Sequence, residues 1–130
     1  MVQETRILVV DDNPCFRKAL MVGISSLGFK NIGVAIDGED ALRQLQEQAF
    51  DLVISDRKMP RMNGFALLAS MKNDTTLKNI PFILMSALDE RSKEQVRAKA
   101  IQLGAVTCMQ KTEMGGDHLR DVIHQALGMS

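Results

Sequence analysis

Short apolar runs recur along this sequence, at residues 7–10, 52–54, 82–85 and, more weakly, 106–109. None of them alternates apolar with polar residues, so neither face of such a strand is suited to contact with water. Continuous apolar strands of this kind are typical of a parallel sheet that helices cover on both faces. Residues 32–35 predict a further strand, at an edge of that sheet.

Segments with a helical period lie between the runs. The first has Asn13 as a candidate N-cap, Pro14 at its first position and Gly28 as a stop. The next two begin at 37–38 and after 63–64. A fourth covers residues 89–103, and a fifth runs nearly to the end of the chain. The residues expected on buried helix faces are Phe16, Leu20, Ile24, Leu27, Leu42, Leu45, Ala49, Val96, Ala100, Leu103, Leu119, Val122, Ile123 and Ala126.

Strand and helix thus alternate five times, which predicts an α/β fold with right-handed crossovers and a parallel sheet between two helical layers. A length of 130 residues with 45% hydrophobic and 25% charged residues suits one soluble globular domain, residues 1–130. Sixteen basic and sixteen acidic residues balance, so we expect no general attraction to nucleic acid or to a membrane surface.

The compartment follows from what the sequence lacks. No stretch approaches the roughly 18 apolar residues of a membrane span, and the first residues do not resemble a signal peptide. Cys15 and Cys108 are far apart and form no C-x-x-C pair, which argues against a disulfide framework and a zinc site. We interpret the protein as cytoplasmic and expect both cysteines to be small buried residues.

Polar residues follow the apolar runs at the point where ligands bind in an open parallel sheet. Asp11 and Asp12 follow the first strand, Ser55 and Asp56 the third, Ser86 and Ala87 the fourth, and Gln110 and Lys111 the fifth. Carboxylates about 5 Å apart repel by roughly 3 kcal/mol at an effective dielectric near 20, so a cation is expected among them. Hard oxygen ligands suit Mg²⁺, and a metal beside a lysine suits phosphoryl transfer with an aspartate as nucleophile.

Four motifs carry a family resemblance: Val-Val-Asp-Asp-Asn at 9–13, Ser-Asp-Arg-Lys-Met-Pro-Arg-Met-Asn-Gly at 55–64, Met-Ser-Ala at 85–87, and Lys111. In this order and spacing they resemble the receiver domains of two-component response regulators, over the whole chain. The resemblance implies a flavodoxin-like fold, with a five-stranded parallel sheet in the order 2-1-3-4-5 and helices on both faces.

The same resemblance implies a metal site. Asp12 and Asp56 would bind Mg²⁺ directly, Asp11 would act through water, and the backbone carbonyl of Lys58 would complete the protein's share of the ligands.

It also implies a switch rather than an enzyme that turns over a separate substrate. Asp56 would take a phosphoryl group from a sensor histidine kinase or a phosphotransfer protein, Lys111 would pair with the phosphoryl oxygens, and Ser86 would move to hydrogen-bond one of them. The response would reach a downstream protein, or a second copy, through the fourth helix, fifth strand and fifth helix. Residues on that face include Arg91, Lys93, Gln95, Arg97 and Lys99.

Two positions depart from the pattern. Cys108 replaces an aromatic residue that usually takes part in the switch, and Thr112 replaces a proline that usually follows the lysine in a cis peptide. A cis bond before a non-proline residue costs roughly 2.5 to 4 kcal/mol, so we expect a trans Lys111–Thr112 peptide. These departures favour an alternative, a pseudo-receiver that binds partners without phosphate.

Two other functions fit less well. A flavin carrier would bind phosphate in the loop at 11–14, where two aspartates repel anions. An aspartate-dependent phosphatase would separate its two aspartates by one residue, whereas Asp11 and Asp12 are adjacent.

Overall fold

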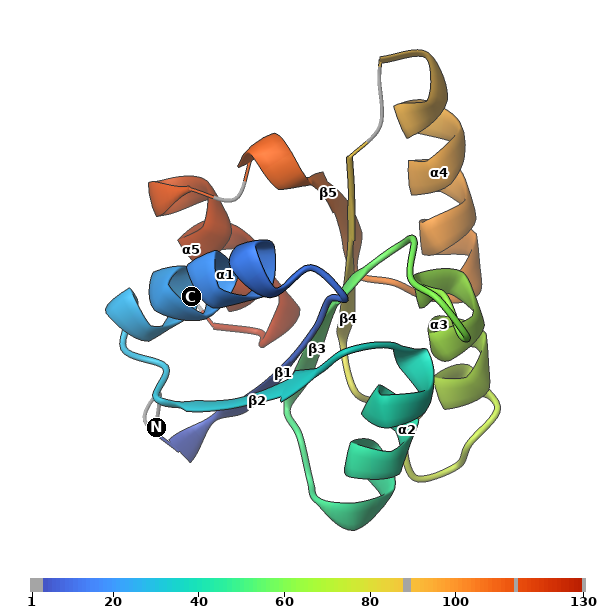
Figure 1. Cartoon of the computed structure of the whole chain (residues 1–130), viewed down its shortest axis with the longest axis horizontal. Coiled ribbons are helices and arrows are strands. Elements are labelled where there is room, and N and C mark those ends of the chain that lie inside the picture. Colours follow the sequence, from blue (N-terminus) through green and yellow to red (C-terminus); the bar gives the residue numbers. More distant parts are fainter. Residues whose placement is uncertain (1–3, 88–89, 114, 130) are drawn as a thin grey trace.

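A five-stranded parallel sheet lies between two layers of helices (Figure 1). The computed structural model describes residues 4–87, 90–113 and 115–129, and the side chains at 90 and 91 lie outside the description. In chain order the elements are β1 (Arg6–Val10), α1 (Pro14–Ser26), β2 (Asn31–Ala35), α2 (Gly38–Glu47), β3 (Leu52–Asp56), α3 (Gly64–Lys72), β4 (Phe82–Ser86), α4 (Glu90–Leu103), β5 (Thr107–Gln110), a 3₁₀ turn (Lys111–Glu113) and α5 (Gly116–Ala126).

The strand order is β2-β1-β3-β4-β5, and every pair of neighbours is parallel. This confirms the predicted α/β fold, its order and the place of residues 32–35 on an edge strand. Val10 pairs with Ser55 across β1 and β3, and Asp56 pairs with Met85 across β3 and β4. The carboxyl ends of the three central strands therefore meet at one edge of the sheet.

Each face of the sheet carries its own core, as Figure 1 shows by the two groups of helices. Leu8 and Val10 belong to the core beneath α2, α3 and α4, whereas Ile7 and Val9 belong to the core beneath α1 and α5. All four side chains are completely buried. A strand covered on both faces must be apolar at every position, which explains why the runs do not alternate.

The helices begin where their capping residues predict. Asn13 Oδ1 accepts hydrogen bonds from the Cys15 and Phe16 N–H groups at 2.9 and 3.1 Å. Asp37 caps α2 and Asn63 caps α3 in the same way, through the N–H groups three residues later. These bonds satisfy donors that have no partner inside the helix.

Two predicted core positions are wrong. Ala49 is exposed, because α2 ends at Glu47 and the backbone is already extended at Gln48. Ala41, one turn before Leu45, is buried in its place. Cys15 is also exposed, whereas Cys108 is buried as expected.

The fourth helix was predicted from residue 89, which lies outside the described residues, and the structure has it from Glu90. Its predicted face is confirmed, since Ala100 is buried and Val96 and Leu103 pack against the core. Among the helices of the described segments, none has the length and apolar character needed to cross a bilayer.

Candidate functional site

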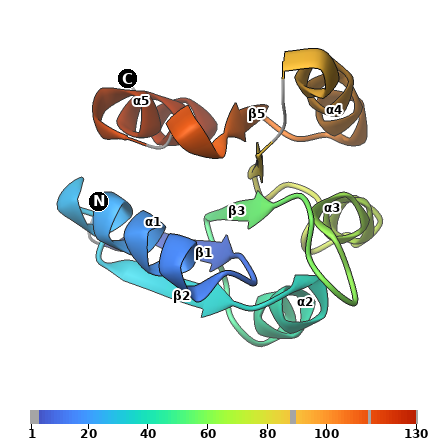
Figure 2. The ribbon, with the colours of Figure 1, turned by 45° about the horizontal axis from the view of Figure 1, so that its top comes forward.

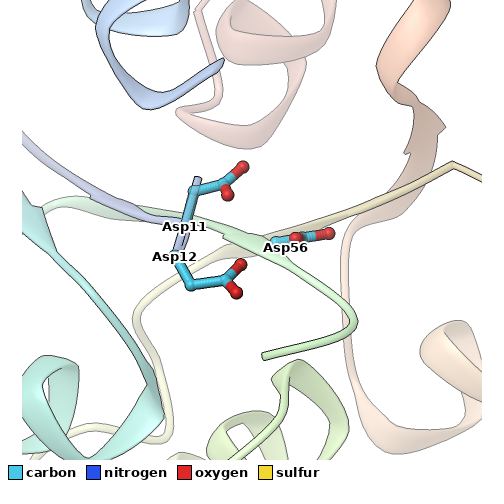
Figure 3. A group of neighbouring side chains, drawn as sticks. All are labelled: Asp11, Asp12 and Asp56. Atoms are coloured by element: carbon cyan, nitrogen blue, oxygen red, sulfur yellow. The ribbon is translucent and has the colours of Figure 1, made fainter. Parts of the chain in front are cut away.

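Three carboxylates gather at the carboxyl end of the sheet, between the ends of β1 and β3. Asp11 and Asp12 directly follow β1, and Asp56 is the last residue of β3. One oxygen from each lies within 4.8 Å of the other two, and Figure 3 shows Asp11 and Asp12 directed to the side on which Asp56 lies. Asp11 and Asp56 are buried, while Asp12 is exposed. The group is thus closed toward the protein and open toward solvent at Asp12.

The Lys111 ammonium joins two of these carboxylates. Its Nζ lies 3.1 Å from Asp11 Oδ2 and 3.2 Å from Asp56 Oδ2. The residue opens the 3₁₀ turn after β5, and its side chain reaches back over the sheet edge. The same Nζ lies 4.4 Å from the centre of the Phe16 ring, which adds a cation–π contact. The structure therefore brings Asp11, Asp12, Asp56 and Lys111 into one pocket.

Burial and charge act on the two central groups of this pocket. Burial raises the pKa of Asp56, the nearby Asp11 carboxylate raises it further, and Lys111 only partly opposes the change. Burial alone would lower the pKa of Lys111, but the carboxylates of Asp56 and Asp11 outweigh it and the pKa is raised. Lys111 consequently stays protonated as an ammonium. Any further positive charge beside Asp56 would stabilise its ionised carboxylate.

The backbone orients the two buried carboxylates. Asp11 Oδ1 accepts the Asn13 N–H at 2.8 Å, and Asp56 Oδ1 accepts the Arg57 N–H at 2.8 Å. The other oxygen of each faces Lys111. Asp11 Oδ2 is buried, and apart from this ion pair it makes no hydrogen bond of good geometry within the described residues. An oxygen-rich group with lone pairs still unused is a suitable donor set for a hard cation such as Mg²⁺.

Ser86 and Lys58 flank the pocket on neighbouring segments. Ser86 is the last residue of β4; it is buried, and its Oγ makes no hydrogen bond within the described segments. A buried hydroxyl without a partner is uncommon and costs stability. Lys58 lies two residues after Asp56 in the loop to α3, with an exposed side chain.

Cys108 and Thr112, the two positions that depart from the receiver pattern, differ in their burial. Cys108 is buried in β5, and its carbonyl accepts a hydrogen bond from Arg97 of α4 at 3.0 Å. Burial raises the pKa of its thiol, and the positive charge of nearby Arg97 opposes this only in part. The Lys111–Thr112 peptide is trans, as expected, and Thr112 is exposed.

Sequence reasoning missed two residues of the first helix that support the site. Phe16, predicted only as a core residue, packs its ring under Lys111, and Arg17 donates to the Asp11 carbonyl at 2.8 Å. Their position was the available signal, because the first turn of a helix that directly follows Asp11 and Asp12 must lie beside them.

Comparisons with known proteins agree with this geometry. The response regulator receiver domain family matches residues 7–124. A probable chemotaxis protein CheY of Rhizobium etli is 35% identical over 111 residues, which cover 85% of this chain and 84% of that protein. Chemotaxis protein CheY-3 of Vibrio cholerae is 37% identical over 99 residues, which cover 76% of this chain and 74% of that protein.

The solved structures show the same fold. The receiver domain of NtrX from Brucella abortus superposes with a TM-score of 0.83 at 29% identity, over 95% of this chain and 99% of that one. The parallel sheet, its strand order and the acidic pocket at its carboxyl edge are thus accompanied by a family match over nearly the whole sequence. This chain belongs to the response regulator receiver domain family.

Proposed function

We propose that the chain is a phosphoryl-accepting signalling switch in which Asp56 receives a phosphoryl group, with Mg²⁺, from a sensor histidine kinase or a phosphotransfer protein. It would act as one receiver domain over residues 1–130 and catalyse only its own phosphorylation and dephosphorylation. The observation that carries the proposal is the pocket in which Asp56 lies within 4.8 Å of two other carboxylates and 3.2 Å from Lys111.

The residues of the pocket fit a magnesium ion. Asp12 and Asp56 would bind it directly, Asp11 through water, and the Lys58 backbone carbonyl would supply the remaining protein oxygen. Asp12 is exposed, so the group is open to an ion from solvent. Bound Mg²⁺ would offset the repulsion among the carboxylates and the negative charge of the incoming phosphoryl group.

The transfer itself requires little from the protein besides positioning. A carboxylate oxygen of Asp56 forms a bond to phosphorus as the bond to the donor's histidine nitrogen breaks, and that nitrogen leaves with its electron pair. The Arg57 N–H holds one carboxylate oxygen in place, at 2.8 Å. Lys111 already faces the other oxygen, from which it can pair with the phosphoryl oxygens as negative charge spreads over them.

The response begins at Ser86. Its buried hydroxyl has no hydrogen-bond partner among the described residues, so a new acceptor on Asp56 would attract it. Movement of Ser86 would pull the end of β4 inward and alter the face formed by α4, β5 and α5. Of the α4 residues expected on that face, Arg97 donates to the Cys108 carbonyl of β5, whereas Lys99 lies over the Phe65 ring and so is directed toward α3 instead. Lys93 and Gln95 lie on the same helix, and the side chain of Arg91 lies outside the described part.

The partner on this face would be a downstream protein or a second copy of the chain. Balanced charge, with sixteen residues of each sign, supports a protein partner and gives no support to direct binding of nucleic acid or membrane. A cytoplasmic location would suit a protein that receives a phosphoryl group from a sensor histidine kinase.

One test separates the switch from a pseudo-receiver, which Cys108 and Thr112 favour. The protein is incubated with Mg²⁺ and acetyl phosphate, and intact mass is measured. We expect one added phosphoryl group, none with EDTA, none with Asp56→Asn, and full labelling of Asp121→Asn, whose carboxylate is exposed on α5. No labelling of the wild type, or labelling that survives Asp56→Asn, would favour the pseudo-receiver.

A further inference from the structure

The loop between β3 and α3, residues 57–63, is fastened to the start of α2. Arg61 Nε donates to Asp37 Oδ2, and the Gly38 N–H donates to the Met62 carbonyl at 3.0 Å. A Cβ on Gly38 would lie 2.7 Å from the Met62 carbonyl oxygen, so the two segments meet at backbone distance. Figure 2 shows this loop, in green, running from β3 beside α2. Two contacts, one ionic and one between backbones, therefore hold the loop from the side.

Arg61 makes this contact from an unfavourable backbone conformation. Its φ is 64°, and elsewhere in the described residues a positive φ occurs only at glycine. The left-handed region is costly for a residue with a Cβ, and such conformations persist only where the surroundings impose them. The Met62 N–H closes a tight turn on the Pro60 carbonyl at 2.7 Å, which aims the Arg61 side chain at Asp37.

The same loop carries part of the proposed metal site. The Arg57 N–H donates to Asp56 Oδ1, and the Gly64 N–H closes the base of the loop on the Arg57 carbonyl at 2.8 Å. Met59 is buried in the core beneath α3. Lys58 lies between Arg57 and Met59, which these contacts hold in place. The position of its carbonyl therefore depends on the position of the loop.

We propose that Arg61 and Asp37 form a clamp that presets the loop for Mg²⁺, which makes Arg61 a positioning residue for the metal. The inference rests on the proposed function, because it assigns the clamp to that site. A ligand group held in place before binding loses less conformational freedom on binding, and this increases affinity. Neither residue belongs to the proposed ligand set, and Asp37 lies on a different element from every member of it.

Electrostatics alone predicts the opposite effect of removing Arg61. Loss of a positive charge near the site leaves Asp37 unpaired and should tighten the binding of a cation. The clamp predicts weaker binding, because the loop loses its lateral contact. The direction of the change in Mg²⁺ affinity therefore discriminates between the two.

The first experiment is calorimetric titration of Mg²⁺ into wild type and Arg61→Ala. We expect Arg61→Ala to bind Mg²⁺ more weakly, with a dissociation constant about three to ten times that of the wild type. Arg43→Ala is the matched control, because Arg43 pairs with Asp40 on α2 and, within the described residues, makes no ion pair or hydrogen bond with the loop. Its dissociation constant should stay within twofold of wild type, and thermal melts confirm that each variant is folded.

A second variant tests the clamp without changing charge. Gly38→Ala would place Cβ 2.6 Å from Met62 Cγ as well as against the Met62 carbonyl, so the loop must shift. We expect Mg²⁺ binding to weaken here too. Gly23→Ala is its control, since the added Cβ would meet only Leu119, at 3.4 Å.

Phosphorylation with acetyl phosphate gives an independent readout. In Arg61→Ala the Mg²⁺ concentration for half-maximal rate should rise by the same factor as the dissociation constant, while the rate at saturating Mg²⁺ stays within twofold of wild type. Unchanged or tighter Mg²⁺ binding in Arg61→Ala, with a wild type that binds Mg²⁺ and is phosphorylated, would overturn the clamp alone. A wild type that binds no Mg²⁺ would overturn the clamp and the proposed function together.

Discussion

Lys111 Nζ lies 3.2 Å from Asp56 Oδ2, although 55 positions separate the two residues in the chain. The contact exists because β3 and β5 are parallel and both end at the carboxyl edge of the sheet, with β4 between them. Lys111 also meets Asp11, so one cation is shared by two buried carboxylates. The charge of the pocket therefore depends on a residue that directly follows the last strand.

Replacement of Lys111 by methionine should slow phosphorylation of Asp56 far more than it weakens Mg²⁺ binding. The ammonium faces the oxygens that carry charge in the transition state, and loss of one such donor costs roughly 10²- to 10³-fold in rate. Removal of a cation should leave Mg²⁺ affinity equal or higher. Rates with acetyl phosphate at saturating Mg²⁺ test this, with Lys99→Met on α4 as a control. A rate within threefold of wild type would contradict the role of Lys111.

The acidic pocket should lower the stability of the metal-free protein. Since burial and Asp11 raise the pKa of Asp56, this group contributes stability that is present below its usual pKa and lost as the pH rises through the raised pKa. At neutral pH the ionised carboxylate therefore destabilises the folded state. Asp56→Asn should increase the free energy of unfolding in EDTA by about 1 kcal/mol.

Urea unfolding of both proteins with and without Mg²⁺ checks this. Mg²⁺ should stabilise the wild type more than Asp56→Asn, because a ligand stabilises the state that binds it. Equal stability of the two proteins in EDTA would show that the carboxylates do not repel as strongly as their burial indicates.

Asp37 should show the opposite dependence on pH. The Asp40 N–H lowers the pKa of this carboxyl, burial partly opposes the change, and Arg61 lowers it further. Its contribution to stability is therefore present above the usual pKa of an aspartate and is lost as the pH falls through the lowered pKa. Asp37→Asn keeps a capping side chain but loses the charge, and should cost about 1 kcal/mol at pH 7.

The difference in unfolding free energy between wild type and Asp37→Asn should shrink as the pH falls through the lowered pKa of Asp37, because the carboxylate takes up a proton there. Urea unfolding of both proteins at a series of pH values measures this difference. A difference that is constant from pH 7 to pH 3 would rule out the ionised form of Asp37 as the stabilising species.

The sequence predicted those parts of the site that depend on strand ends. Asp11, Asp56 and Lys111 each border an apolar run, and parallel strands must bring such residues to one edge. Arg61 and Asp37 were missed because their contact joins two loops across 24 positions and depends on one unusual φ, which no residue pattern encodes. The period of α2 likewise could not show where that helix ends, so Ala49 was misplaced.

Ser86→Ala should separate the switch from the chemistry. The Ser86 hydroxyl is buried without a hydrogen-bond partner in the described part of the chain, so its removal should leave the unfolding free energy unchanged or raise it. Labelling of Asp56 by acetyl phosphate should persist, because within the described residues Ser86 makes no hydrogen bond to the attacking carboxylate. The change that phosphorylation causes at α4 and β5 should shrink, because the hydroxyl can no longer bond the phosphoryl oxygen. Hydrogen exchange of both elements, with and without phosphorylation, measures this change, and Ser86→Thr should retain it. An unaltered exchange response in Ser86→Ala would exclude Ser86 as the link between Asp56 and that face.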